Sequence, residues 1–294
     1  MAKTILFLGA TGGVGLSALR RALSAGHTCI ALCRTPSNLT SQLPADLVPS
    51  ESTTNNTSTN TNNNTNLHII TGNAHDPAAV TRCFSTVPSP IDTIVFSLGA
   101  YPTLRGMSDP HVCEKGMGVL LDVLRAQRAQ RDNSVNNTTQ KEDQTSNYQP
   151  PHLIAISTTG ISSLGRDIPL LVVPLYKVGL HTAHEDKRGM ERLVIAAGTS
   201  SLSSHHSSKG GQREGEGKGE GLVRFTLIRG SLYTSGPETE GLVRVGVEDV
   251  GKGVVEKREL GYTISREDVG KWVWEECIKV EGGQWVGKAV GVTY

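Results

Sequence analysis

The sequence predicts an α/β fold in which a doubly wound parallel sheet carries helices on both faces. Short apolar runs of strand length alternate with helical patterns about seven times, and such alternation gives a parallel sheet covered on both sides. The first apolar run, residues 4–8, leads directly into a turn with Gly9, Gly12 and Gly15, and a helical pattern follows at once. Strand, glycine-rich turn and helix in this order indicate a dinucleotide-binding sheet.

Length and composition limit the class of protein. The 294 residues are 37% hydrophobic, so we expect one full α/β domain over residues 1–294. The net charge of +1 gives no basic surface for nucleic acid or an anionic membrane. The five cysteines are scattered without metal-ligand spacing, so we expect reduced thiols in a cytoplasmic protein and no metal site. Met1 leads straight into the first strand, so we expect no signal peptide, and no apolar run is long enough to span a membrane.

Each glycine of the first turn has a physical role in holding a dinucleotide. Gly9 lets the chain turn sharply off the strand, Gly12 lets backbone amides approach a pyrophosphate, and Gly15 lets the helix pack closely on the strand. The free N–H groups at the helix start attract the phosphates. We therefore expect the pyrophosphate to be held by Gly9, Thr11, Gly12, Gly13, Val14 and Gly15. The alternative is a flexible loop that happens to contain glycines.

The next helix and strand bear on the choice of cofactor. Apolar residues recur at helical spacing until Gly26 ends the helix, and residues 27–33 form the second predicted strand. This strand ends at Arg34, where an acidic residue would accept hydrogen bonds from the ribose 2′-hydroxyl of NAD. The guanidinium is instead suited to a 2′-phosphate, which favours NADP. The alternative is an arginine in a surface loop.

The middle of the chain continues the alternation. Residues 67–72 form the third strand, and Asp76 and Pro77 begin a helix that runs to about Phe84. Residues 91–97 form the fourth strand. Strand ends at this edge line a cofactor crevice, so we expect Ser97 and Gly99 near the ribose or the nicotinamide. Asp109 and Pro110 cap the next helix.

The C-terminal half completes a Rossmann fold with a small C-terminal substrate lobe. Its predicted elements are strands at 152–156, 222–228, 243–247 and 285–292, a helix at 181–198, and a helix that begins at the capping residue Ser265 and continues to Ile278. Three polar segments interrupt the pattern, at 50–66, 132–149 and 199–221. Such compositions bury too little apolar surface to fold, so we expect disordered insertions.

The motif Gly-Ala-Thr-Gly-Gly-x-Gly at residues 9–15 resembles that of the atypical short-chain dehydrogenase/reductase superfamily, in particular its NmrA-like and flavin-reductase-like branch. The resemblance extends along most of the chain. It implies that Asn73 contacts the adenine and that Ser157, at the end of the fifth strand, is the catalytic serine; the alternative is that Ser157 only caps the strand. Residues 229–232 are similar to the family's Arg-Pro-x-x-Leu segment beside the nicotinamide, with Gly230 in place of proline.

The catalytic pair of the conventional enzymes is incomplete. Those enzymes use Tyr-x-x-x-Lys, in which the lysine lowers the pKa of the tyrosine and holds the ribose. Lys187 matches the lysine, and the tyrosine position is then Ala183. Tyr176 precedes this helix and can cover the site as part of a lid. His184 and Asp186 flank Ala183 as alternative proton donors, although a solvated helix histidine is the simpler interpretation of His184, and Lys187 either binds the ribose or faces water.

Two functions remain open at this point. The first is an NADPH-dependent oxidoreductase that passes hydride to a small carbonyl, quinone or flavin-like acceptor, with a role in secondary metabolism as in similar fungal families. The second is a non-catalytic NADP-binding redox sensor, because members of the resembling branch that lack the tyrosine fall into both groups. A sugar-nucleotide epimerase fits less well, since epimerases usually keep the Tyr-x-x-x-Lys pair. We expect a small-molecule substrate and a monomer or homodimer.

Overall fold

The computed structural model describes residues 1–48, 66–100, 102–103, 106–136, 149–198, 221–280 and 283–294. The three predicted polar insertions lie largely outside these residues. The second predicted insertion, 132–149, begins too early, because residues 132–136 belong to the long helix α4 (Val112–Asn136). A helix can continue beyond the residues that carry its apolar pattern, so its end is not marked by that pattern.

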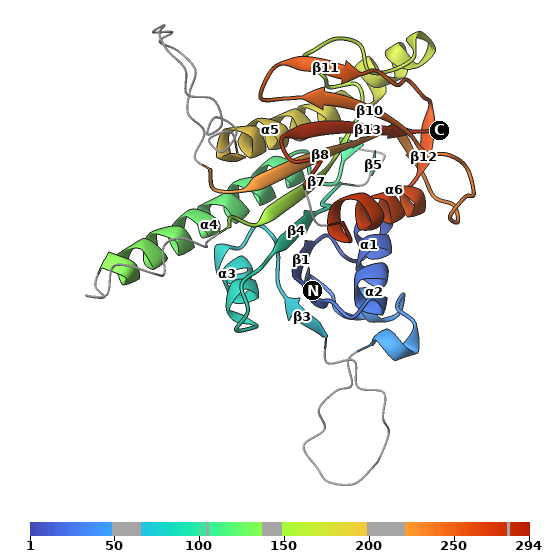
Figure 1. Ribbon diagram of the computed structural model, residues 1–294. Helices are drawn as coiled ribbons and strands as arrows, with labels where there is room; N and C mark the ends of the chain where they lie inside the picture. Colours follow the sequence, from blue (N-terminus) through green and yellow to red (C-terminus); the bar gives the residue numbers. More distant parts are fainter. Residues whose placement is uncertain (49–65, 101, 104–105, 137–148, 199–220, 281–282) are drawn as a thin grey trace, which may run out of the picture.

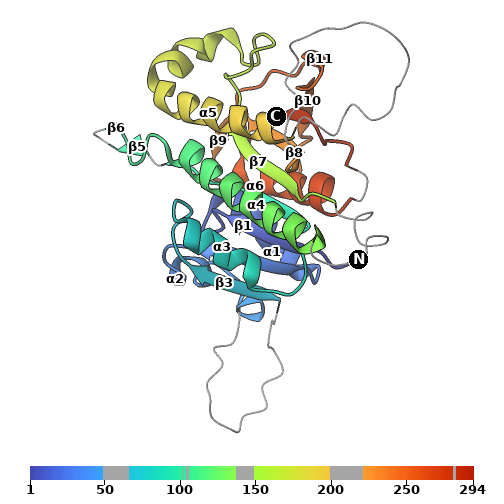
Figure 2. The same cartoon turned by 90° about the vertical axis from the view of Figure 1, so that its left-hand side faces the viewer.

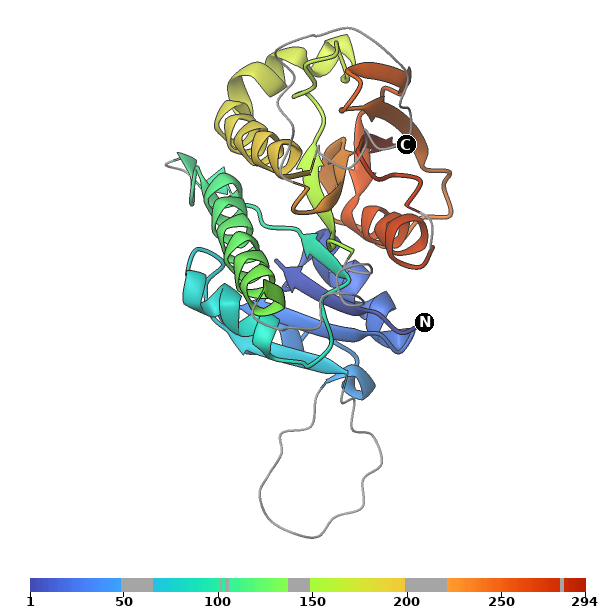
Figure 3. The same ribbon diagram turned by 60° about the vertical axis from the view of Figure 1, so that its left-hand side comes forward.

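A nine-stranded sheet forms the centre of the molecule, in the order β3-β2-β1-β4-β7-β8-β13-β10-β11. Figure 3 shows the N-terminal strands in blue and the C-terminal strands in orange and red at opposite ends of this sheet. The strands are β1 Thr4–Leu8, β2 Thr28–Cys33, β3 Leu67–Thr71, β4 Thr93–Phe96, β7 His152–Thr158, β8 Arg224–Gly230, β10 Arg244–Asp249, β11 Val254–Lys257 and β13 Lys288–Thr293. The first seven in sheet order are parallel. At the edge β10 runs antiparallel to β13, and β11 runs antiparallel to β10. The predicted doubly wound sheet is confirmed.

Helices cover both faces of this sheet (Figures 1 and 2). Helix α1 (Gly13–Ser24) and helix α6 (Arg266–Trp272), which continues as the π-helical turn η5 (Val273–Ile278), lie side by side on one face. Helices α3 (Pro77–Ser85), α4 and α5 (His181–Gly198) cover the other. The alternation along β1 explains the two layers, because Ile5 and Phe7 join one apolar core and Leu6 and Leu8 the other.

The remaining elements are short, and the sequence pattern did not predict them. They are α2 Ser37–Thr40, η1 Ala45–Leu47, the hairpin β5 Pro102–Thr103 and β6 Gly106–Met107, the turns η2 Leu170–Val172 and η3 Leu175–Gly179, and the parallel pair β9 Leu232–Thr234 and β12 Thr263–Ser265. Segments of two to five residues are too short to carry a periodicity. In the described part of the chain, no helix is both long and apolar enough to cross a membrane.

Two helices are capped by a residue next to them in the sequence, and one is capped by a residue from another helix. Asp76 caps α3 and Ser265 caps α6, as predicted, since each side chain accepts the N–H of a residue in the first turn. Asp109 instead accepts the N–H of His111, before α4 begins, and lies 3.9 Å from the Nδ1 atom of His75. The first turn of α4 is satisfied by the buried carboxylate of Asp186 on α5, which accepts the N–H groups of Cys113 and Glu114 at 2.8–3.2 Å.

Candidate active site

The glycine turn between β1 and α1 is tightly packed at two positions and open at a third. Gly9 has φ +97°, and a Cβ on it would lie 2.5 Å from the Ser97 carbonyl oxygen. A Cβ on Gly15 would lie 2.3 Å from the Gly9 carbonyl oxygen, so the helix crosses the strand end at a distance that only glycine allows. A Cβ on Gly12 would meet no atom within 4 Å. The turn therefore leaves free space at Gly12, at the start of α1.

The positive end of the α1 helix dipole is not balanced by an acidic or capping side chain of its own first turn. Gly12 is the N-cap, no side chain caps the helix, and no acidic residue lies in its first turn. Three or four backbone N–H groups at a helix N-terminus have no intrahelical acceptor, and the helix dipole adds a partial positive charge there. Free amides, open space and a carboxyl-edge position are the features that suit a pyrophosphate. Thr11 is exposed beside them, and Val14 is buried in the core behind.

The predicted adenosine-side residues stand at the ends of neighbouring strands. Arg34 directly follows β2 and is exposed, and it makes no hydrogen bond or ion pair with another described residue. Asn73 follows β3 and is exposed, with its side-chain oxygen accepting the N–H of His75 at 3.1 Å. Since β1, β2 and β3 are adjacent and parallel, Arg34 and Asn73 lie on the same edge of the sheet as the glycine turn.

Lys187 lies between the ends of β4 and β7. Its ammonium donates to the carbonyl oxygens of Leu98 at 3.0 Å and Ile156 at 2.7 Å, and its third donor can serve the neighbouring Cys113 thiol or a ligand. The half-buried Ser97 and the exposed Gly99 flank Leu98 at this strand end. Lys187 therefore lies at the carboxyl edge rather than in water, and Ala183 stands one helical turn before it on the same face.

The predicted proton donors are more buried than the sequence suggested. His184 is 4% exposed, so it is not a solvated helix histidine, and burial lowers the pKa of its imidazole to about 4. Tyr176 lies in the turn η3, 3% exposed, with its ring centroid 5.2 Å from that of His184, and burial raises the pKa of its phenol. Both side chains are therefore uncharged at neutral pH. Asp186 is occupied by the amides of α4, which removes it as a proton donor.

Ser157 and His184 each bury a polar atom without a partner. The Ser157 hydroxyl is completely buried at the end of β7, and neither it nor the Nε2 atom of His184 has a hydrogen-bond partner among the described residues. Ser157 therefore does not cap the strand. An unsatisfied buried polar atom is costly, and one reason that proteins retain such atoms is contact with a ligand or an ordered water.

Gly230, the residue in place of the family's proline, is explained by Tyr233. The Tyr233 ring lies so close that a Cβ on Gly230 would be 2.4 Å from it. The Gly230 N–H also donates to the Tyr233 hydroxyl at 3.1 Å, and proline has no N–H to give. The same hydroxyl donates to the Ser157 carbonyl oxygen at 2.7 Å, so Tyr233 joins the ends of β7 and β8. Neighbouring Arg229 is buried between Glu191 and Glu248 and has a structural role.

Sequence reasoning missed two residues of this edge, Tyr233 and Arg266. Arg266 begins α6 immediately after its cap, and its side chain reaches the glycine turn, with its Cδ 3.0 Å from the position of a Cβ on Gly13. The sequence identified Ser265 as a helix start, but no pattern pairs residue 266 with residue 13. That proximity follows only from the packing of α6 on α1.

The chain is similar over almost its whole length to two fungal proteins. It is 34% identical over 304 residues to "Reductase pytE" of Aspergillus terreus and 31% identical over 317 residues to "Oxidase pynE" of Aspergillus niger, covering 99% of this chain and 98% of each relative. No protein-family model matches the chain.

Solved structures share the fold at low sequence identity. A short-chain dehydrogenase/reductase from Veillonella parvula in complex with NADP has a TM-score of 0.61 at 13% identity, with 100% of this chain and 95% of that one covered. ChuY from Escherichia coli O157:H7, described as an anaerobillin reductase, has a TM-score of 0.56 at 14% identity, with 99% and 97% covered.

Proposed function

The chain belongs to the atypical short-chain dehydrogenase/reductase family, and from this premise we propose that it is an NADPH-dependent oxidoreductase. The acceptor of the hydride is a carbonyl, quinone or flavin-like compound, and the branch of the family is the NmrA-like and flavin-reductase-like one. The names of the two relatives, a reductase and an oxidase, support redox chemistry, and the NADP in the Veillonella structure supports the cofactor class.

The observation that carries the proposal is the glycine turn. Gly9 and Gly15 let strand and helix approach closely, Gly12 leaves open space, and the first amides of α1 lack any side-chain cap. This cradle fits a pyrophosphate in shape and charge. Exposed Arg34 at the end of the adjacent strand is free to pair with a 2′-phosphate, which favours NADP over NAD.

The roles of the remaining residues follow from their places on the edge. Bound NADPH would supply the hydride. Lys187, anchored by two backbone carbonyls, would hold the nicotinamide ribose with its third donor. Ser97 and Gly99 would line the ribose and nicotinamide, and Asn73 would contact the adenine. The Ser157 hydroxyl is completely buried and unpaired at the end of β7, so it would have to become accessible on cofactor binding to act as the catalytic serine.

Proton supply is the step for which this chain differs from the conventional enzymes. Ala183 has no proton to donate. Burial raises the pKa of the Tyr176 phenol, which therefore keeps its proton as a weak acid, and burial lowers the pKa of the His184 imidazole to about 4, so at neutral pH His184 has already lost the proton that it would donate. Tyr176 is therefore the stronger candidate donor, and His184 can donate only after it has taken up a proton. Acceptors that take their proton from water, such as quinones and flavins, therefore suit the site better than ketones that need a strong acid.

Cofactor titration tests the proposal. We expect the wild type to bind NADPH more tightly than NADH, and Arg34→Ala to lose about tenfold or more in affinity for NADPH, because one charge-assisted contact is removed. Affinity for NADH should change little in the same variant. If the folded wild type binds neither cofactor, the proposal is contradicted. If Arg34→Ala loses affinity for NADPH and NADH equally, Arg34 does not bind the 2′-phosphate.

Ala183 also supports a second candidate, a non-catalytic NADP-binding redox sensor. The two functions are separated by turnover. An oxidoreductase consumes NADPH in the presence of a quinone, a flavin or a polyketide-type ketone, which are the acceptor classes that a role in secondary metabolism would supply. A sensor binds NADPH with the same affinity and consumes none with any acceptor of the panel.

A further inference from the structure

Arg266 brings a positive charge to the glycine turn from the far end of the chain. Its side chain lies against Gly13, with Cδ 3.0 Å and Nε 3.7 Å from the position of a Cβ there. Gly13 has φ +56° and is the first residue of α1, so the guanidinium stem packs beside the uncapped amides. Any larger residue at position 13 would displace this arginine.

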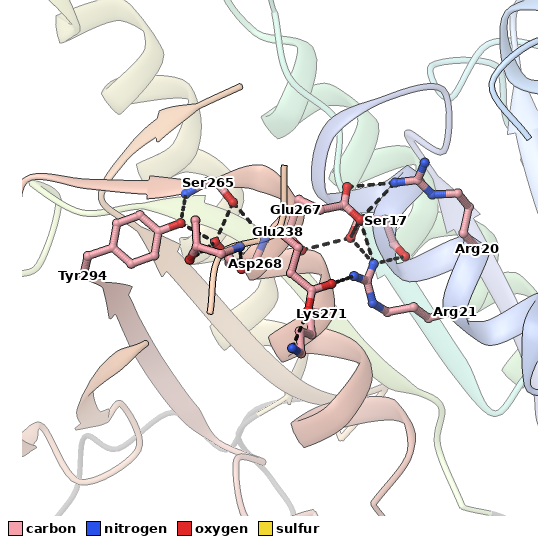
Figure 4. Close-up of polar contacts among 10 residues, drawn as sticks. Ser17, Arg20, Arg21, Glu238, Ser265, Glu267, Asp268, Lys271 and Tyr294 are labelled. Atoms are coloured by element: carbon pink, nitrogen blue, oxygen red, sulfur yellow. Dashed lines mark hydrogen bonds and ion pairs between the residues drawn. The ribbon is translucent and has the colours of Figure 1, made fainter. Parts of the chain in front are cut away.

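The position of Arg266 is fixed by its neighbours on α6. Ser265 caps the helix, and the Glu267 carboxylate accepts from Ser17 and from the guanidinium groups of Arg20 and Arg21 on α1 (Figure 4). Glu238 pairs with Arg21 and Lys271, which fastens the loop after β9 to both helices. Because the first turn of α6 is held on α1 by a network of half-buried and exposed ion pairs, Arg266 is positioned beside the glycine turn by its neighbours.

The charge of Arg266 is not neutralised by a carboxylate. Its Nη1 donates to the Tyr233 carbonyl oxygen at 3.3 Å and to the Ser235 hydroxyl at 3.2 Å, and its guanidinium carbon lies 5.6 Å from the Tyr233 ring centroid. In the part of the chain that the structure describes, no ion pair includes Arg266. The adjacent acids are committed elsewhere, Glu267 to α1 and Asp268 to Ser265, Thr239 and Tyr294. Donors on Nε and Nη2 are therefore available to an anion.

We propose that Arg266 binds the pyrophosphate of the dinucleotide, opposite the amides of the glycine turn. This inference rests on the proposed function, since it assumes a dinucleotide at the turn. Arginine offers paired donors in a fork that matches phosphate oxygens. Through Tyr233 the same side chain is joined to the ends of β7 and β8, so it links the phosphate cradle to the nicotinamide side of the edge.

The test compares binding of NADPH and NADH to the wild type, Arg266→Met and Arg266→Lys by titration. Methionine keeps an unbranched stem to pack on Gly13 and Tyr233 and removes only the charge and the donors. We expect Arg266→Met to weaken both cofactors by a similar factor of about ten, because the pyrophosphate is common to both, and Arg266→Lys to recover part of the loss. This pattern differs from that of Arg34→Ala, which affects NADPH alone.

Lys279→Met is the matched control. Lys279 directly follows η5 at the end of the same helical segment, is exposed and carries the same charge, so its removal reports long-range electrostatics without touching the turn or the ion pairs that position Arg266. Unchanged affinity in Arg266→Met, loss confined to NADPH, or equal loss in Lys279→Met overturns the inference. If the wild type binds neither cofactor, the proposed function itself is refuted. The experiment therefore distinguishes failure of the Arg266 inference from failure of the proposed function.

Discussion

Gly230→Ala is expected to disturb the active-site edge through one side chain. The added Cβ would lie 2.4–2.5 Å from three atoms of the Tyr233 ring and hydroxyl, whereas ordinary contact begins at 3.4 Å. The ring must therefore retreat by about 1 Å, a figure set by the difference between these distances. A displacement of that size breaks or distorts the hydrogen bonds of the Tyr233 hydroxyl to the Ser157 carbonyl oxygen and from the Gly230 N–H.

The free-energy cost follows from these contacts. Overpacking a filled site costs about 1–3 kcal/mol, and each lost hydrogen bond contributes about 1 kcal/mol net. With both hydrogen bonds lost, Gly230→Ala should therefore destabilise the protein by about 3–5 kcal/mol. Because Tyr233 also lies under the Arg266 guanidinium, cofactor affinity should fall with stability.

A double-mutant cycle in urea denaturation isolates the cause. In a Tyr233→Ala background the added methyl meets no ring, so Gly230→Ala should cost about 2 kcal/mol less than in the wild type. In a Tyr233→Phe background the ring remains, so the overpacking part of the cost should persist while the hydrogen-bond part is already lost. An equal cost of Gly230→Ala with and without the ring refutes the explanation of Gly230 by Tyr233.

The remaining predictions concern stability. Burial, followed by the charges of Arg224 and Lys3, lowers the pKa of His152 to about 3, well below its ordinary value of 6.5, so the folded state keeps the imidazole neutral while the unfolded state gains a proton as pH falls below 6.5. Lowering the pH from 7 to 5 should therefore reduce the free energy of unfolding by about 2 kcal/mol through this residue. In His152→Gln, the fall in the free energy of unfolding between pH 7 and 5, measured by urea denaturation, should be smaller by that amount. An equal fall in wild type and variant contradicts the reasoning. Asp186→Asn should cost about 1–3 kcal/mol, because an amide nitrogen replaces a charged acceptor at the start of α4. Glu185→Gln is its control, because Glu185 is an exposed neighbour that forms an ion pair with Arg188, and its cost should stay within about 0.5 kcal/mol by thermal denaturation. Equal costs for the two variants would show that Asp186 does not cap α4.

The sequence determined the individual strands and the glycine turn because each depends mainly on residues close together in the chain. A continuous apolar run places the strand β1 at its observed bounds, and the spacing of Gly9, Gly12 and Gly15 marks a turn between this strand and the helix that follows it. The helix at 181–198 and the cap at Ser265 were predictable for the same reason.

The tertiary structure alone decided which distant side chains meet at the edge. The capping of α4 by Asp186, the contact of Arg266 with Gly13, and the two carbonyl partners of Lys187 each join segments separated by dozens of residues or more. The antiparallel pairing of β10 with β13 and with β11 was also undetermined, since period-2 alternation is the same for both directions. Local pattern fixes where a residue points on its own element, but only packing between elements brings a partner to it.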